Sequence, residues 1–301
     1  MSERKNTAKS QPNSVRLSVP KTYKLYIDGK FPRSESGRSY QVHDAAGNFL
    51  ANAARASRKD LRDAVVAARK AFAGWSAATG YNRGQVIYRV AEMLSGRSAQ
   101  FVAEVAASEG VPTKTAQSIV DTSIDRLVWY AGWTDKLAAV FGAANPVAGP
   151  YFSFSVPEPT GIIGVLAPQK SSLLGLVSVL APTLAGGNTC VLIASQAHPL
   201  PAITLAEVLA TSDVPAGVVN ILTGYPDELG QWLASHADVN ALDLVGAQPK
   251  QRAELERAAA ETVKRIVRAG DVESTDWADE PDLRRLRAGL ETKTVWHPIG
   301  V

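Results

Sequence analysis

Few residues in this chain could carry out covalent or metal chemistry. The single cysteine, Cys190, lies in the apolar run Thr189–Ile193. A thiolate is a strong nucleophile, but a cysteine inside an apolar, β-branched run is typical of a buried strand, where it behaves as a small hydrophobic residue. We therefore predict a structural role for Cys190. We also predict no metal site, because the four histidines are not separated by the short intervals typical of metal ligands. They are His43, His198, His236 and His297.

A lysine and three glycines form a second group of candidates, for cofactor binding. Lys170 follows an apolar run and could bind an anion, although a loop lysine is more often only solvated. Glycines let a backbone approach a phosphate, yet they also serve ordinary turns and tight helix packing. Pro226, which has no backbone N–H, lies in the loop between two of these glycines and so removes a hydrogen-bond donor from it. The three glycines, which are weak evidence for a bound nucleotide, are Gly224, Gly230 and Gly246.

The elements that position these residues follow a regular pattern. Three apolar runs, GIIGVLA, TCVLIAS and GVVNILT, are each followed by a helical segment, and Asn240–Val245 extends the series. Strands that alternate with helices predict an α/β fold with a Rossmann-like, doubly wound parallel sheet. Upstream, Asp28 and Gly29 predict a hairpin turn and Ser57 predicts a helix N-cap. Two long amphipathic segments, 82–110 and 115–142, predict further helices.

Composition limits the classes of partner and the location. The net charge is +3, and residues 1–21, which we predict to be a disordered tail, themselves carry a net charge of +4. The remainder is near neutral, so we expect no nucleic-acid partner. No run approaches the ~18 apolar residues of a membrane span, and no signal peptide follows the first methionine. We expect a cytoplasmic protein without a membrane partner.

Several segments resemble motifs of the aldehyde dehydrogenase superfamily and occur in the family's order. The resemblance implies a nucleotide-binding domain, placed here at residues 22–270, and NAD(P) as the family's cofactor. A "YYAGWxDK"-like sequence upstream, in the amino-terminal half, is also similar to the family. The segments that match the nucleotide domain are Gly161–Ser172, Ala181–Ala194, Pro215–Gly224 and Leu244–Ala247.

The family's chemistry needs a cysteine nucleophile, a glutamate base and an amide donor, and this sequence departs from the pattern at each. No counterpart of the separate catalytic domain follows residue 270, so we expect that domain to be absent. The glutamate segment corresponds to Ile266–Gly270, which has no acid, and Lys170 replaces the asparagine. Ile193 and Gln196 replace a ribose-binding lysine and a glutamate, and Ala247 replaces a serine near the phosphates. We expect no NAD(P) binding or only weak binding.

Two further segments predict strands outside the sheet. Residues 142–160 resemble the family's oligomerisation hairpin, and 271–301 resemble a linker followed by its terminal oligomerisation strand. Composition alone fits an edge strand of a monomer equally well for the first segment. For the second, the alternative is a frayed terminus, because a twelve-residue strand signal is short. The chain is similar to the degenerate second half of two-part aldehyde dehydrogenases. We expect a non-catalytic subunit that forms a homo-oligomer or joins a complete aldehyde dehydrogenase. The alternatives are an NAD(P)-dependent oxidoreductase active alone and a nucleotide or small-molecule binding module.

Overall fold

A five-stranded parallel sheet forms the centre of the protein. The computed structural model describes residues 19–267 and 275–300. The strands lie in the order β10-β9-β6-β7-β8, and every neighbouring pair is parallel. This order confirms the predicted Rossmann-like sheet. The strands are β6 (Ile162–Leu166), β7 (Thr189–Ile193), β8 (Val219–Leu222), β9 (Ala241–Asp243) and β10 (Arg265–Val267).

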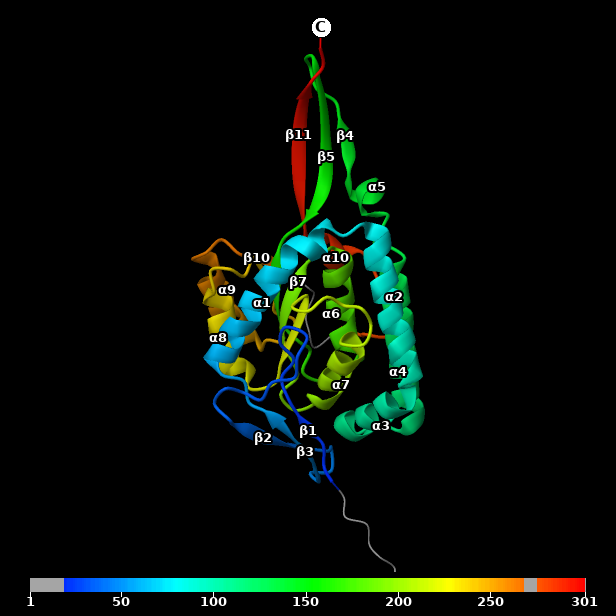
Figure 1. The fold of residues 1–301 in the computed structure, drawn as a ribbon, viewed down its shortest axis with the longest axis vertical. Coiled ribbons are helices and arrows are strands. Elements are labelled where there is room, and N and C mark those ends of the chain that lie inside the picture. Colours follow the sequence, from blue (N-terminus) through cyan, green and yellow to red (C-terminus); the bar gives the residue numbers. More distant parts are fainter. Residues whose placement is uncertain (1–18, 268–274, 301) are drawn as a thin grey trace, which may run out of the picture.

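Helices cover both faces of this sheet, as a doubly wound fold requires. Alternate strand residues serve the two faces: Ile162 and Leu166 pack beneath α1, α8 and α9, whereas Ile163 and Val165 pack beneath α6 and α7 (Figure 1). Because both faces are covered, most residues of these strands are apolar, with Thr189, Asn220, Asp243 and Arg265 as exceptions. The five helices are α1 (Arg58–Ala77), α6 (Leu174–Ala185), α7 (Leu200–Leu209), α8 (Pro226–Ser235) and α9 (Pro249–Ala260).

The amino-terminal part confirms the predicted turn and cap. Ile27 and Lys30 exchange two backbone hydrogen bonds of 3.0 Å around Asp28 and Gly29, whose φ angles are 53° and 71°. Positive φ at both central residues is the geometry that an Asp-Gly pair favours. Ser57 caps α1 and accepts hydrogen bonds from two backbone N–H groups. A small sheet contains β1 (Thr22–Tyr23), β2 (Ser39–His43) and β3 (Phe49–Ala54).

The two long amphipathic segments are each divided in the structure. The first breaks at Arg97, and the second ends its long helix at Ala131 before a short further helix. The helical period continues across each break, so hydrophobic spacing alone does not reveal it. The first three of these helices pack against one another and against α6 or α7 beside the sheet, and the short last helix contacts the strand 151–159. They are α2 (Gly80–Gly96), α3 (Ser98–Glu109), α4 (Thr113–Ala131) and α5 (Leu137–Phe141).

A third sheet, which is antiparallel, protrudes from one end of the molecule (Figure 1). Its order is β11-β5-β4, and β11 pairs with β5 from Leu290 opposite Pro159 to Pro298 opposite Tyr151. The predicted hairpin and terminal strand are therefore present. The strands are β4 (Ala143–Asn145), β5 (Tyr151–Pro159) and β11 (Leu290–Pro298), and α10 (Arg284–Ala288) precedes β11. Most of the predicted tail, residues 1–18, and the start of the predicted linker lie outside the described residues.

Candidate functional site

The carboxyl ends of the parallel strands define the candidate site. Strands β6 and β9 are neighbours, and the chain continues from β6 to β7 but from β9 to β10, so these two connections run in opposite directions along the sheet. Open α/β sheets bind ligands at such a switch point, in the crevice outside the strand ends. The loops that meet there follow β6, with Lys170, and β9, with Gly246. Two of the four residues that the sequence indicated as possible cofactor contacts thus lie in the loops of this crevice.

Backbone contacts join the two loops of the switch point. The N–H of Gly246 donates to the carbonyl oxygen of Leu166 over 2.9 Å. A Cβ added to Gly246 would lie 1.8 Å from the carbonyl oxygen of Ala167. Position 246 therefore requires glycine because two backbones touch there. Close packing accounts for Gly246 without a bound nucleotide.

A glutamine side chain joins the loop after β6 to the loop after β7. Gln169 donates from Nε2 to the carbonyl oxygen of Ala167 over 2.7 Å, and its Oε1 accepts from the N–H of Gln196 over 3.0 Å. The hydroxyl of Ser195 donates to the carbonyl oxygen of Gln169 over 2.8 Å. Sequence reasoning missed this bridge, because its partners lie far apart in the chain. It fixes the two loops beside the position at which Gln196 replaces the family's glutamate.

Lys170 stands at the exposed rim of this crevice. Within the described parts of the chain, no carboxylate forms an ion pair with it. Behind it, the N–H and the hydroxyl of Ser172 both donate to Oε1 of Glu109 at the end of α3, over 2.6 Å each. The loop after β6 is therefore held by Ser172, and the amine of Lys170 is available to solvent.

The other two glycines lie elsewhere. Gly224 follows β8, and two strands, β6 and β7, separate β8 from β9 and its Gly246. Its φ of 148° favours glycine, and a Cβ there would lie 3.3 Å from the backbone nitrogen of Ala56. The motif places Gly230 in a loop, but it lies within α8, where a Cβ would contact Leu255 of α9 at 3.4 Å. Because Pro226 takes the first helical position, the helix begins early and includes Gly230.

The remaining polar positions of the family pattern are filled by buried apolar groups. Ile193 ends β7 with no exposed surface, and Ala247 is buried after β9. Cys190 has no exposed surface, and burial raises the pKa of its thiol to about 12. The predicted burial of Cys190 is confirmed, and a thiol in this environment is a poor nucleophile. Nowhere in residues 19–267 or 275–300 do three or more His, Cys, Asp or Glu side chains come together as a metal site would require.

The described helices include none that is long and apolar enough to span a membrane.

Residues 31–274 match the model of the aldehyde dehydrogenase family. The chain belongs to this family. The 2-hydroxymuconic semialdehyde dehydrogenase of Pseudomonas sp. strain CF600 is 33% identical over 251 residues, which are 82% of this chain and 51% of that protein. The omega-crystallin of Enteroctopus dofleini is 30% identical over 246 residues, 80% of this chain and 49% of the crystallin.

Solved aldehyde dehydrogenase structures confirm the fold. The NAD⁺ complex of the Bacillus cereus enzyme superposes with a TM-score of 0.77 at 26% identity and covers 82% of this chain and 50% of that chain. The HpcC structure from Thermus thermophilus gives the same TM-score of 0.77 at 28% identity, over 82% of this chain and 47% of that one. The chain spans about half the length of the two curated relatives and 28% of the cytosolic 10-formyltetrahydrofolate dehydrogenase of Xenopus tropicalis, to which it is 31% identical. The family match ends before β11 begins.

Proposed function

We propose that this chain is a non-catalytic, aldehyde dehydrogenase-like subunit that assembles with itself or with a complete aldehyde dehydrogenase. The observation that carries the proposal is the protruding sheet, whose apolar face and outer edge have no partner among the described residues. The proposed assembly segments are 142–160 and 271–301, attached to a nucleotide-type domain of residues 22–270. We further propose that the subunit works in the cytoplasm.

One face of the protruding sheet carries a cluster of apolar side chains beside Lys293 and His297. The register sets Phe154 opposite Val295 and Phe152 opposite His297, so these side chains share a face with Val156. Phe152 is 51% exposed, and its ring centroid lies 5.5 Å from that of Phe154. A sheet face with aromatic and β-branched side chains is stabilised when another surface covers it. This face is therefore the proposed contact surface.

The opposite face differs in chemistry. The hydroxyl groups of Ser155 and Thr294 are 2.9 Å apart, and the side-chain amide of Asn145 donates to Ser155 over 2.9 Å. Aromatic residues recur at its tip, where the ring centroids of Tyr151 and Trp296 lie 5.8 Å apart. A polar ladder of this kind is stable in water. The two faces can thus be tested separately.

Strand β11 also has an unpaired edge. It pairs with β5 on one side, and the sheet order places β11 at the margin. Proteins usually protect such edges, because unpaired N–H and C=O groups add further strands readily. Two charged residues of β11, Glu291 and Lys293, already pair with Arg265 and Glu158 over 2.5 Å and 2.9 Å. Their charge is thereby neutralised, which weakens one device that normally keeps edges apart.

The crevice supports the non-catalytic part of the proposal. Cys190 lies near the amino end of β7, away from the crevice, and burial raises the pKa of its thiol, while Lys170 is an exposed rim residue that no described carboxylate pairs with. Ile193 offers no hydrogen bond where the family binds ribose, and each lost hydrogen bond costs on the order of 1 kcal/mol. We propose weak NAD(P) binding at most, with Lys170 and the three glycines as its candidate contacts in this chain.

Point variants of the two faces test the assembly role. Phe154→Glu places a charge on the apolar face, and Thr294→Glu places the same charge on the polar face. If the apolar face is the contact, light-scattering chromatography shows a smaller assembly for Phe154→Glu and an unchanged mass for Thr294→Glu. Far-UV circular dichroism confirms that both variants keep the helices. Equal masses for Phe154→Glu and the unmodified chain would contradict the proposal.

A further inference from the structure

We propose that a groove beside the start of α1 binds a phosphate ester, with the phosphate between Arg38 and Arg58 and the organic body against Trp232. The groove lies outside the switch-point crevice, on the α1 and α8 side of the sheet. It adds a ligand to the chain and does not depend on assembly.

Two neighbouring cavities form this groove. The smaller has a volume of about 330 Å³, and Arg38 and Arg58 line it. The larger has a volume of about 600 Å³ and is lined partly by Leu61 and His236. Ser57, Arg58 and Trp232 line both cavities, so the two cavities adjoin. These volumes lie in the range of small-molecule sites.

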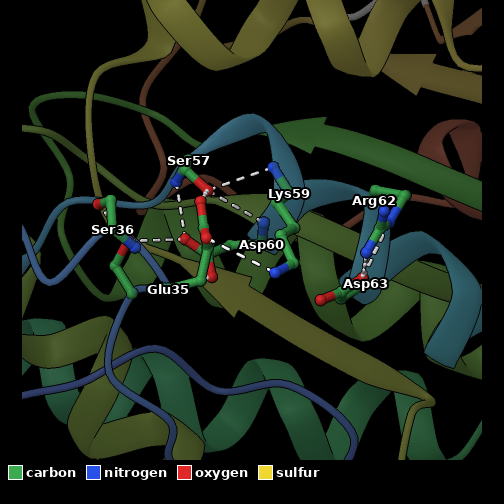
Figure 2. A network of polar contacts seen from close by, with 8 residues as sticks. Glu35, Ser36, Ser57, Lys59, Asp60, Arg62 and Asp63 are labelled. Carbon is green, nitrogen blue, oxygen red and sulfur yellow. Dashed lines mark hydrogen bonds and ion pairs between the residues drawn. The ribbon is translucent and has the colours of Figure 1, made fainter.

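Most charges around the groove are already paired. Lys59 Nζ lies 3.7 Å from the carboxylate of Glu35, and Arg62 lies 2.7 Å from that of Asp63; Figure 2 shows both pairs. Arg55 pairs with Glu228 of α8. Within the described residues, no carboxylate pairs with Arg38 or Arg58. The groove therefore presents two uncompensated guanidinium groups.

A second arginine, stacked on an aromatic ring as Arg58 is, binds an acidic group through its free edge. The guanidinium of Arg55 lies 4.5 Å from the ring centroid of Tyr225, and its N–H edge binds the carboxylate of Glu228. The guanidinium of Arg58 lies 3.9 Å from the ring centroid of Trp232 in the same manner, but it has no acidic partner in the described part of the chain. Stacking leaves the donors of a guanidinium in a fixed fork that matches an anion with two oxygens. An external anion would complete the second arrangement.

The wall of the groove is fixed before any ligand binds. The buried carboxylate of Asp60 accepts from the hydroxyl of Ser34 over 2.8 Å, from the N–H of Glu35 over 3.1 Å and from the N–H of Ser57 over 2.8 Å. These bonds tie the loop before β2 to the first turn of α1, as Figure 2 shows in part. Preformed walls lower the entropic cost of binding.

The lining selects the class of ligand. Two guanidinium groups suit a doubly charged phosphate, because each can donate two hydrogen bonds to it. Trp232 is 41% exposed and supplies apolar surface to both cavities. A phosphate ester with a planar organic body suits both the two guanidinium groups and the apolar surface of the groove. Adenosine monophosphate is the probe, with inorganic phosphate and adenosine as its separated parts.

Calorimetric titration of the full chain tests the site. We expect saturable binding of adenosine monophosphate, weaker binding of inorganic phosphate, and loss of about tenfold or more in affinity for Arg38→Ala and Arg58→Ala. Arg58→Lys keeps the charge but not the planar stack, and we expect it to restore only part of the affinity. Both arginines are exposed, so circular dichroism should show unchanged folding.

Two control variants distinguish binding in this groove from a nonspecific effect of lost positive charge and from binding in the switch-point crevice. Arg89→Ala removes an exposed arginine of α2, and Lys170→Ala alters the switch-point crevice. Neither should change the affinity for adenosine monophosphate. The proposal is overturned if binding is absent at millimolar probe, if Arg58→Ala binds as tightly as the unmodified chain, or if Lys170→Ala abolishes binding.

Discussion

Gly246 touches the backbone of the neighbouring strand end: a Cβ at this position would lie 1.8 Å from the carbonyl oxygen of Ala167. The same residue donates its N–H to Leu166 over 2.9 Å. The two loops of the switch point are therefore held together by main-chain contact. Any side chain at position 246 must separate them.

This contact predicts the result of a small substitution. Gly246→Ala should destabilise the protein by roughly 1 to 3 kcal/mol, because the added methyl group forces a backbone shift. Gly74→Ala is the matched control, since a Cβ there meets nothing within 4 Å in the later part of α1. That change should be neutral or stabilising by up to about 1 kcal/mol. Urea unfolding measures both, and equal effects would show that Gly246 is not sterically required.

A buried ion pair attaches α10 to the central sheet. Asp243 of β9 is buried and pairs with Arg285 of α10, which also lies over the ring of Trp277. Removal of one partner leaves the other charge buried and unpaired, so Arg285→Met should cost roughly 3 to 5 kcal/mol. The double variant with Asp243→Asn should recover much of this loss. A double-mutant cycle measures the coupling, and simple additivity would argue against the pair.

The same pair predicts a dependence on pH. Burial raises the pKa of the Asp243 carboxyl above its usual range, and Arg285 opposes this shift. Without Arg285 the pKa should rise further. A carboxyl with a raised pKa binds its proton more tightly in the folded state, so the variant loses stability as pH rises above about 4. The cost of Arg285→Met should therefore be larger at neutral pH than in acid. A cost that does not change with pH would contradict this account.

One asparagine links the central sheet to the protruding strands. Asn188 has no exposed surface; its Oδ1 accepts from the N–H of Gly161 and its Nδ2 donates to the carbonyl oxygen of Gly289, both over 2.9 Å. Asn188→Ala leaves the N–H of Gly161 without a partner and leaves the carbonyl of Gly289 with only its bond from the N–H of Thr160, which should cost roughly 1 to 3 kcal/mol. Hydrogen exchange should show the largest loss of protection at the start of β6 and of β11. Unchanged protection at β11 would remove the proposed link.

The thiol gives a direct chemical readout. Burial raises the pKa of Cys190 to about 12, so the native protein should react slowly with a thiol reagent at pH 8 and rapidly after unfolding. Because the chain has one cysteine, all reaction with the thiol reagent reports on Cys190. The purified chain should also show no aldehyde-dependent reduction of NAD or NADP. Turnover that Cys190→Ala abolishes would overturn the structural role of this residue.

The sequence predicts the elements better than the contacts between them. Four of the five parallel strands follow from apolar runs, whereas β10 spans Arg265–Val267 and is too short for a periodic signal. The prediction of a loop at Gly230 is wrong, because sequence spacing does not show where a helix begins after Pro226. The bridge from Gln169 to Gln196 and the stack of Arg58 on Trp232 join distant segments. Such contacts depend on tertiary packing, which local pattern does not encode.

The mass of the purified chain in solution tests the central claim most directly. Light-scattering chromatography from nanomolar to micromolar concentration should give a mass at least twice that of the 32.0 kDa chain at the upper end. Deletion of residues 290–301, which removes β11, should convert this assembly into a monomer or an aggregating species with little change in the helical signal. A well-behaved monomer at micromolar concentration that the deletion leaves unchanged, and that also stays monomeric with a complete aldehyde dehydrogenase, would contradict the assembly role.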